Sequence, residues 1–300
     1  MSGEDALIGL RLVQYAGACL LLGVPVFLLT AGRRLSLSGA GVLVVAGAVA
    51  TASCALLAVL AQTAVMAGAW ADALNRDALL MVALHTGLGL SMLVRAAAAM
   101  AVAAAATLRP GRLRWSAATA FGLIAVGSFA WSGHAGATEG VGAMLHPLAD
   151  ALHAISATIW FGALTALTLI CRRPEAARDP ATPEAFAAFS SVGTVAVATL
   201  ALTGLVNAAF LVGVERIDQT LEGAWGRLLV VKLALFAALL SLAASNRWRL
   251  TPALARAQAK GEPRPAFDRL TRSLTLEVLI AVTLLAVVAV LGLQPPPVHA

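Results

Sequence analysis

Long apolar runs recur eight times along this 300-residue sequence, and they constrain its fold more than any other feature. About 20 consecutive apolar residues are enough for a helix to cross the hydrocarbon core of a bilayer. Charged residues make up 12% of the chain, whereas soluble proteins carry about 25%. We therefore predict an all-α, polytopic membrane helical bundle that forms a single domain over residues 1–300. The expected transmembrane helices, about eight, are 8–30, 39–66, 79–106, 116–132, 147–171, 190–213, 227–246 and 273–293.

The charged residues between these spans alternate in sign along the chain. The segments after the first, third, fifth and seventh spans together hold 15 Lys and Arg against 5 Asp and Glu. The amino-terminal region and the other connecting segments hold 4 Lys and Arg against 8 Asp and Glu. Because short basic loops stay on the cytoplasmic side, both termini are predicted to lie outside. The asymmetry accounts for the basic net charge without a nucleic-acid partner. Residues 246–272 are expected to form a solvated cytoplasmic loop that contacts anionic lipid.

The fifth span carries polar residues along one face. His146, Asp150, His153 and Trp160 follow one another at spacings of four, three and seven residues. At about 100° per residue, all four fall within roughly 80° of arc on a helix. Histidine and aspartate are costly inside a bilayer, so their presence there indicates a functional site.

Four of the five histidines are expected near the outer face at similar depth. His85 enters the third span from outside, where it shares a narrow face with Met81, Met92 and Arg95. Imidazole and thioether ligands together favour copper, and Cu(I) in particular. We therefore predict a metal site near the outer face. Its expected ligands are His85, His134, His146, His153, Met81 and Met144.

Other polar residues are expected to support this site or to line a path through the bundle. Asp150 is interpreted either as a ligand or, by a slight preference, as the partner of Lys232. Trp160 is expected to pack below the site as a floor or gate. Deeper in the bundle, an ion pair between Arg95 and Glu277 is predicted in the cytoplasmic half. That pair, and Asn207 in the sixth span, serve equally well as structural links between helices or as parts of a conduction path.

The carboxy-terminal half contains, over about 134–297, the segments GHA at residue 133, HPLADALHAISATIWFGALTAL, TGLVNAAFLVG, WGRLLVVKLALF, LAASNRWRLTPAL and RSLTLEVLIAVTLLAVVAVLGLQPPP. In these segments the chain resembles the copper resistance protein D (CopD) family of bacterial inner-membrane proteins. The resemblance implies copper handling from the periplasm toward the cytoplasm, often beside a small periplasmic copper-binding protein. The family-like positions are His134, His146, His153, Trp160, Asn207, Lys232, Asn246 and Glu277.

Three functions remain open at this point. The first is a permease that moves copper, as Cu(I) or Cu(II), inward from the periplasm; it would not be an enzyme, and the sequence contains no GxxxxGK[ST] nucleotide-binding loop. The second is an electron-transfer protein in which His85 and a histidine of the fifth span hold a b-type haem. The third is a scaffold or sensor that binds copper outside without moving it across.

Overall fold

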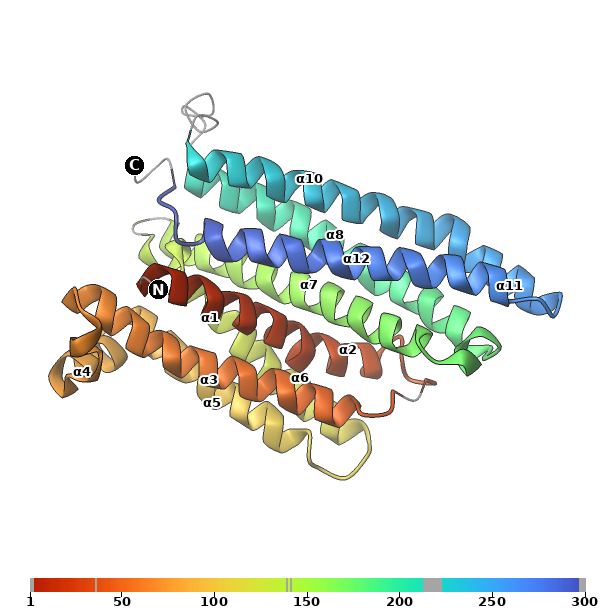
Figure 1. Cartoon of the computed structure of the whole chain (residues 1–300), viewed down its shortest axis with the longest axis horizontal. Coiled ribbons are helices and arrows are strands. Elements are labelled where there is room, and N and C mark those ends of the chain that lie inside the picture. The colour runs from red at the N-terminus through yellow and green to blue at the C-terminus, as the bar shows by residue number, and fades with distance from the viewer. Residues whose placement is uncertain (1–2, 36, 139, 141, 213–222, 297–300) are drawn as a thin grey trace.

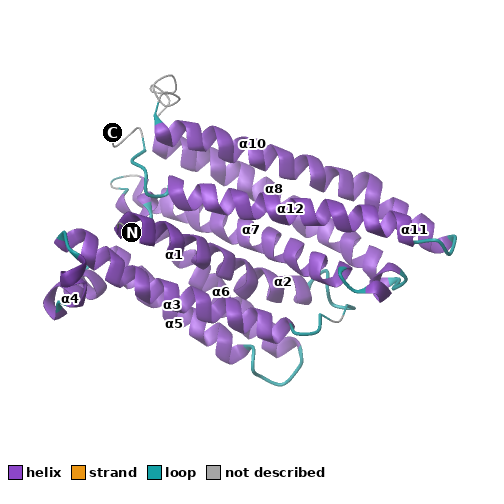
Figure 2. Cartoon of the chain, viewed as in Figure 1, coloured by secondary structure: helices purple, strands orange, loops and turns teal. Residues whose placement is uncertain are grey.

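The computed structural model describes residues 3–35, 37–138, 140, 142–212 and 223–296. It confirms an all-α membrane bundle, with no strand in the described residues (Figures 1 and 2). Eight described helical segments are long and apolar enough to cross a membrane. They are Glu4–Leu29, Ala40–Ala67, Gly87–Ala105, Arg112–Ser132, Gly142–Cys171, Ala181–Val212, Ala224–Ala259 and Arg264–Leu291.

Most spans consist of one α-helix, and some are joined to a π- or 3-10-helical segment. The α-helices are α1 (Gly3–Ala18), α2 (Val24–Leu29), α3 (Ala40–Ala67), α4 (Arg76–His85), α5 (Gly87–Ala105), α6 (Arg112–Gly127), α7 (Gly142–Cys171), α8 (Ala181–Val212), α10 (Ala224–Ser245), α11 (Thr251–Ala259) and α12 (Arg264–Leu291). The shorter segments are the π-helices η1 (Cys19–Gly23) and η7 (Asn246–Leu250) and the 3-10 helices η2 (Trp70–Leu74), η3 (Ser128–Ser132), η4 (His134–Ala137) and η5 (Pro174–Ala177).

The helices pack around two apolar clusters, one in each half of the chain. The first cluster is built from α1, α3, α5 and α6, and α1 packs against α3, which packs against α5. The second is built mainly from α7, α8, α10 and α12. In that half α7 packs against α8 and α12, and α10 packs against α12. The two halves meet where η1 and α2 lie against α7.

A pair of glycines allows the two halves to approach closely. A Cβ atom on Gly162 of α7 would lie 2.1 Å from the carbonyl oxygen of Cys19 and 2.6 Å from the Cα of Gly23. A Cβ on Gly23 would lie 2.3 Å from the carbonyl oxygen of Thr158. Small residues at such crossings let helix backbones touch in a membrane, where packing replaces the hydrophobic effect as the main attraction between helices.

The third span differs from the prediction because the helix breaks at Thr86. This residue is extended, with φ −115° and ψ 144°, and its Oγ1 accepts a hydrogen bond from the Gly89 amide at the start of α5. The preceding helix α4 is a separate short element that packs on α3 and α5 at the end of the bundle where α1 begins (Figure 1). The predicted continuous helix over 79–106, and the shared face of Met81, His85, Met92 and Arg95, are therefore wrong.

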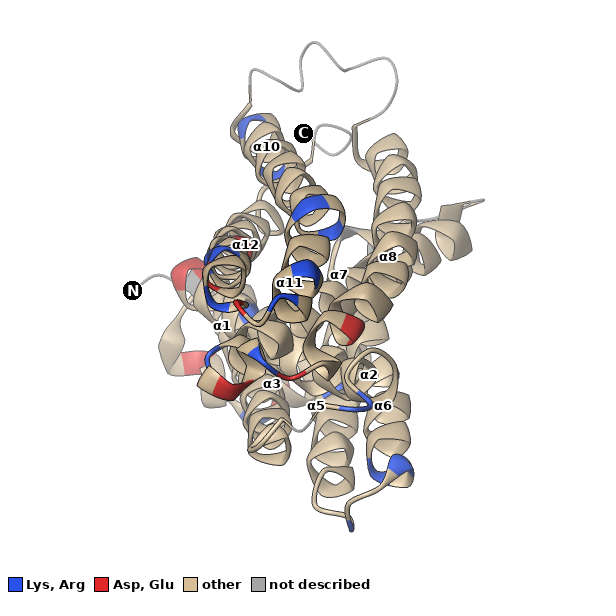
Figure 3. Ribbon diagram, turned by 90° about the vertical axis from the view of Figure 1, so that its right-hand side faces the viewer, with Lys and Arg blue, Asp and Glu red and all other residues tan. Residues whose placement is uncertain are grey.

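The basic connecting segments lie together at the opposite end of the bundle. Arg34 forms a salt bridge of 2.7 Å with Glu184, and Arg173 donates a hydrogen bond to Ser38. Figure 3 looks onto this end and shows Lys and Arg around α11 and beside α6. The loop predicted over 246–272 is wrong, since helix continues from α10 through η7 and α11 to Ala259.

Candidate functional site

Helix α7 positions the histidines of the fifth span. It begins at Gly142, earlier than predicted, and contains Pro147 in its second turn. His146, Asp150 and His153 follow at intervals of about one turn, so their Cα atoms rise by about 6 Å and then about 4.5 Å along the axis. Helix α8 packs along α7 and supplies the polar side chains that contact two of these three residues.

His146 is enclosed at the start of α7. Its side chain is 2% exposed, and its ring stacks on Phe210 of α8 with a centroid distance of 4.7 Å and an interplanar angle of 8°. Its Nδ1 lies 2.7 Å from Oγ1 of Thr138, in the segment that precedes α7. Thr138 and Phe210 were not among the expected site residues, because neither residue type by itself indicates a contact with a particular histidine.

The hydrogen bonds of His153 define its tautomer. The Nδ1 atom lies 3.0 Å from Oγ1 of Thr203. The Thr203 hydroxyl donates its one proton to the carbonyl of Thr199 at 2.6 Å, so it accepts from His153. On this hydrogen-bond pattern we assign the proton to Nδ1 and the free lone pair to Nε2. A neutral imidazole with one nitrogen held by a hydrogen bond and the other unprotonated is the form that binds metals.

Asp150 and Lys232 complete a cluster with His153, Thr203 and Asn207, which we call the His153 cluster. Asn207 Nδ2 donates to Asp150 Oδ1 at 3.2 Å, and the amide oxygen of Asn207 is buried without a hydrogen-bond partner. Lys232 on α10 interacts electrostatically with both Asp150 and His153. No salt bridge of 4.0 Å or less joins Lys232 to Asp150. Helix α7 thus directs a carboxylate and an imidazole, α10 an amine, and α8 a hydroxyl and an amide into one region within the spans.

The other expected ligands lie on or near the surface at the same end of the bundle. Met144 is 82% exposed at the start of α7, and Met81 and His85 are exposed on α4. Helix α4 packs on α3, α5 and η2 and is not placed against α7. The side chain of His134 lies outside the described residues, although η4, which begins at His134, packs on α7.

The structure therefore does not assemble all the predicted ligands into one site. Within the described part of the chain, no three His, Cys, Asp or Glu side chains are grouped closely enough to hold a metal ion. His146 and His153 share one face of α7, whereas His85 belongs to a different element. Helix α4, which carries Met81 and His85, lies at the same end of the bundle as the start of α7 (Figure 1).

Trp160 packs two turns below His153 in the core of the second half. It is buried and contacts Phe161 at a ring-centroid distance of 5.6 Å and Phe236 of α10 at 6.1 Å, edge to face. The indole thus joins α7 to α10 below the His153 cluster. Whether it acts as a gate stays a prediction.

Arg95 belongs to the first half of the bundle and is not paired with Glu277. Its guanidinium donates to Gln14 Oε1 at 2.7 Å, to Ser132 Oγ at 2.6 Å and to both Oγ and the carbonyl of Ser128. It also lies 3.7 Å from the ring centroid of Phe129. The predicted ion pair between Arg95 and Glu277 is wrong: Glu277 instead accepts a hydrogen bond from Asn246. Helix spacing alone places residues at a depth but does not tell which neighbouring helix they face.

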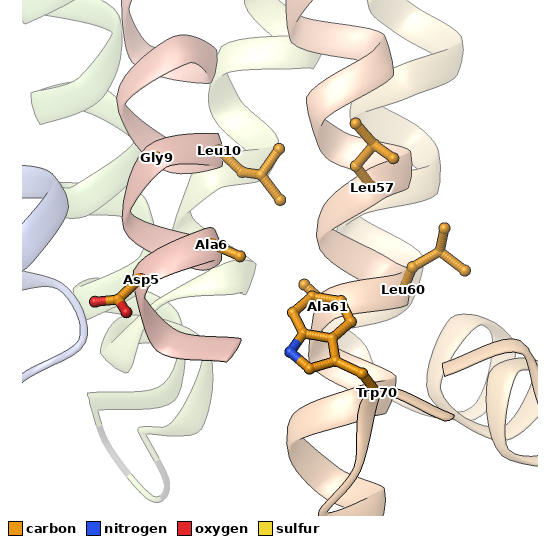
Figure 4. Close-up of a pocket in the computed structure, with 8 residues that line it drawn as sticks. All are labelled: Asp5, Ala6, Gly9, Leu10, Leu57, Leu60, Ala61 and Trp70. Carbon is orange, nitrogen blue, oxygen red and sulfur yellow. The ribbon is translucent and has the colours of Figure 1, made fainter. Parts of the chain in front are cut away.

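Two apolar grooves on the described surface are separate from these polar residues. One, of about 390 Å³, lies between α1 and α3, with Leu10, Leu57, Leu60 and Trp70 directed into it (Figure 4). The other, of about 480 Å³, lies between α5 and α6. Neither groove is lined by a histidine or a methionine.

Eight apolar helices with histidine, aspartate and lysine inside the spans define a polytopic membrane protein with an intramembrane polar site. Comparison with known proteins is more specific. The family described as Copper resistance protein D matches residues 183–291, and the family described as Copper resistance protein D-like, N-terminal domain, matches residues 2–145. The chain is 32% identical to Copper resistance protein D of Pseudomonas syringae pv. tomato over 99% of both chains. It therefore belongs to the copper resistance protein D family.

Two further relatives match over shorter regions. Inner membrane protein YebZ of Escherichia coli (strain K12) is 30% identical over 55% of this chain and 54% of its own. Copper transport protein CutJ of Bacillus subtilis (strain 168) is 33% identical over 41% of this chain and 22% of its own. No solved structure matches the chain. Together with the eight spans, these relatives indicate a multi-pass inner-membrane protein with a copper-related function, as predicted.

The matched ranges correspond to the two halves of the bundle. The amino-terminal family covers the four spans around the first apolar cluster, and the Copper resistance protein D family covers α8 to α12 around the second. Helix α7, which carries His146 and His153, lies between the two matched ranges for most of its length. The histidine face of α7 packs on α8 within the second half, whereas the Thr158–Gly162 part of the same helix contacts the first half.

Proposed function

We propose that this protein is a permease that carries copper from the periplasm toward the cytoplasm along the polar face of α7. The observation that carries the proposal is the state of His153. It lies within a membrane span, and its hydrogen bond to Thr203 leaves Nε2 unprotonated. A neutral imidazole with a free Nε2 lone pair is a good ligand for copper, and a histidine inside a membrane span indicates a functional site.

The spacing of polar groups along α7 supports a stepwise path. His146, Asp150 and His153 succeed one another at about one helical turn, so a copper ion would move by about 5 Å at each exchange of ligand. A path of single ligands holds the ion weakly at each position, and conduction requires sites that release as well as bind. Lys232 balances the charge of Asp150 while no copper ion is bound there.

Surface donors at the same end suit the capture of copper. Met81, His85 and Met144 are exposed, and thioether with imidazole selects copper over harder metal ions. We propose that these residues and His134 pass copper to His146. A small periplasmic copper-binding protein is the proposed donor, and the positive-inside pattern predicts that this end of the bundle lies on the periplasmic side.

The decisive experiment measures copper flux in sealed proteoliposomes that contain a copper-sensitive dye inside. His153→Ala is expected to reduce uptake at least tenfold, because the lone pair of Nε2 is lost, while the amount of inserted protein stays the same. His153→Met retains a soft donor and is expected to recover part of the flux. Uptake by His153→Ala equal to that of the wild type would overturn the proposal.

The same experiment separates the permease from the other two functions. A scaffold would bind copper at His153 but would give no uptake in wild-type proteoliposomes. A haem protein would show a Soret band after purification, but the structure does not bring His85 of α4 against α7, so the expected pair of axial ligands is not assembled.

A further inference from the structure

A second polar cluster lies inside the spans of the carboxy-terminal half, where η7 meets α12. It consists of Asn246, Ser273 and Glu277, and we call it the Glu277 cluster. Their exposed fractions are 7%, 7% and 1%, so all three are buried. Asn246 Nδ2 donates a hydrogen bond to Glu277 Oε1. Three oxygen atoms of the cluster are buried without a hydrogen-bond partner: Asn246 Oδ1, Ser273 Oγ and Glu277 Oε2.

The Asn246–Glu277 contact leaves two acceptor oxygens available to one positive charge. The hydrogen bond uses Asn246 Nδ2 and Glu277 Oε1, and it leaves Asn246 Oδ1 and Glu277 Oε2 without a partner. With Glu277 ionised, both of these oxygens are acceptors only, so each lacks a donor or a cation. Ser273 is one turn from Glu277 on α12 and adds a third acceptor to the same face. Hard cations prefer oxygen ligands, and the cluster offers three unpartnered oxygens, one of which belongs to the buried carboxylate itself.

No neighbouring charged side chain takes the place of such a cation among the described residues. The salt bridges there do not include Glu277. Lys232 on α10 is 14 residues before Asn246, which is about 21 Å along a helix. On α7 the ionisable side chain nearest in level to Glu277 is the buried thiol of Cys171, which hydrogen-bonds with Thr271 of α12 and cannot supply a positive charge. His153 lies toward the other end of α7. On α1, Arg11 approaches Gly292, 15 residues beyond Glu277 on α12.

The basic residues nearest in sequence point elsewhere. Arg247 of η7 donates to Ser190 and Thr194 on α8, and Arg249 is exposed. Arg256 of α11 donates to the carbonyl of Pro252 on its own helix. Arg269 and Arg272, which precede Glu277 on α12, are also exposed. A buried, ionised Glu277 would therefore have no opposite charge close by, and a charge in that state is strongly disfavoured.

We propose that the Glu277 cluster is a binding site for one exchangeable monovalent cation, a proton or a sodium ion, held between Glu277 Oε2, Asn246 Oδ1 and Ser273 Oγ. A proton on Oε2 makes the carboxyl a donor to Asn246, and a sodium ion is ligated by the three oxygens. The site contains no soft donor, so it does not suit copper. Its role as the site of the coupling ion rests on the proposed function.

Infrared difference spectroscopy of the purified, copper-free, full-length protein tests the site. The pH is stepped in a sodium-free choline buffer, and the carbonyl stretch of a buried, protonated carboxyl group is followed. The wild type is expected to gain and lose this band reversibly, and Glu277→Gln is expected to lack it. Glu184→Gln, which changes an exposed carboxylate in a surface ion pair, is the matched control and is expected to keep the band.

Addition of sodium chloride at fixed pH distinguishes the two cations. Loss of the band on addition of sodium identifies a sodium site, and an unchanged band identifies a proton site; both outcomes support the proposal. Ser273→Ala keeps the carboxyl group and is expected to weaken sodium binding about tenfold, or to shift the carbonyl frequency of a proton site. A band that is absent at every pH, or present and invariant to both pH and sodium, would overturn the proposal.

The test is independent of copper transport. The spectra are recorded without copper. A reversible Glu277 band therefore supports the cation site even when His153→Ala leaves copper uptake unchanged and the permease is overturned. Conversely, loss of copper uptake in His153→Ala beside an invariant Glu277 band would support the permease and overturn the cation site.

Discussion

His153 illustrates how a hydrogen bond across fifty residues of sequence decides the chemistry of a side chain. The hydroxyl of Thr203 uses its proton within α8 and can only accept from the imidazole. The threonine thereby determines which ring nitrogen is available to a metal ion. Residue types and spacing on α7 indicated a histidine in the membrane, but its tautomer depends on the packing of α8.

Replacement of Thr203 by valine tests this dependence. Thr203→Val removes the acceptor while it preserves the shape of the side chain, so His153 is free to adopt the other tautomer. Copper affinity is expected to fall about tenfold or more, as for the loss of other residues that orient a metal ligand. The measurement is competition with a chromogenic Cu(I) chelator in detergent.

Thr199→Val is the matched control, because Thr199 is partly exposed and its hydroxyl donates to the carbonyl of Val195 on its own helix. Its copper affinity is expected to equal that of the wild type. Equal affinities for both variants would show that Thr203 does not orient His153.

Arg95 shows the limit of depth as a guide to partners. It was expected to pair with Glu277, because both are charged residues inside spans. In the structure its donors are satisfied by Gln14 of α1 and by Ser128 and Ser132 of η3, and Phe129 covers its face. The guanidinium thus links three segments of the first half and has no contact with the histidine face of α7.

At the scale of elements, the break at Thr86 separates residues that a continuous helix would align. Met92 on α5 is buried in the first apolar cluster, whereas Met81 and His85 on α4 are exposed. Thr86 and Gly87 are a known pattern for the start of a helix, since threonine is a good N-cap. The apolar character on both sides of the break nevertheless predicts one long span, because hydropathy does not record backbone direction.

The glycine crossing at Gly162 yields a prediction about helix packing. Gly162→Ala is expected to destabilise the protein by about 3 kcal/mol, since its Cβ would overlap the carbonyl of Cys19 at 2.1 Å. Thermal unfolding in detergent, followed by fluorescence-detected gel filtration, measures the change. Gly127→Ala is the control, because no atom lies within 4 Å of its Cβ position. A melting temperature for Gly162→Ala equal to that of this control would contradict the close contact.

At the scale of the whole molecule, the bundle has two four-span halves, and α7 of the second half contacts η1 and α2 of the first. The four basic connecting segments meet at one end, through contacts such as Arg34 with Glu184 and Gln258 with the carbonyls of Ala177 and Asp179. The face of α7 with His146 begins at the other end. The molecule is therefore polarised along its long axis, with soft metal donors at one end and positive charge at the other.

This polarity predicts the orientation in the membrane. Single cysteines are placed at Ala71 in η2 and at Lys260 beyond α11, both exposed, in a variant whose native cysteines are replaced by serine. A membrane-impermeant maleimide is expected to label Ala71→Cys at the outer face of the inner membrane when only the outer membrane is permeabilised. Lys260→Cys is expected to react after the inner membrane is opened. Labelling in the reverse order would show that the protein has the opposite orientation in the membrane.

Much of the fold was predictable because a bilayer imposes strict rules on sequence. Seven of the predicted spans overlap single helical spans, and the apolar residues that define them are visible in the sequence. The boundaries at 142, 181 and 259 were missed, since the helices continue into less apolar residues where the apolar runs stop. For the site, His146, Asp150 and His153 were correctly placed on one helix, whereas the hydrogen-bond partners of Arg95 and Glu277 were not foreseen.

The sequence by itself determined the class of the molecule, the eight spans, the charge polarity and the presence of histidine and aspartate on one face of α7. These properties depend on local composition and helical periodicity, which act within a single segment. Only the tertiary structure decided that His85 lies on a separate helix, that Thr203 orients His153, and that Glu277 faces Asn246. Those facts depend on how neighbouring helices rotate about their axes, which is settled by contacts such as the Gly23–Gly162 crossing between residues far apart in the chain.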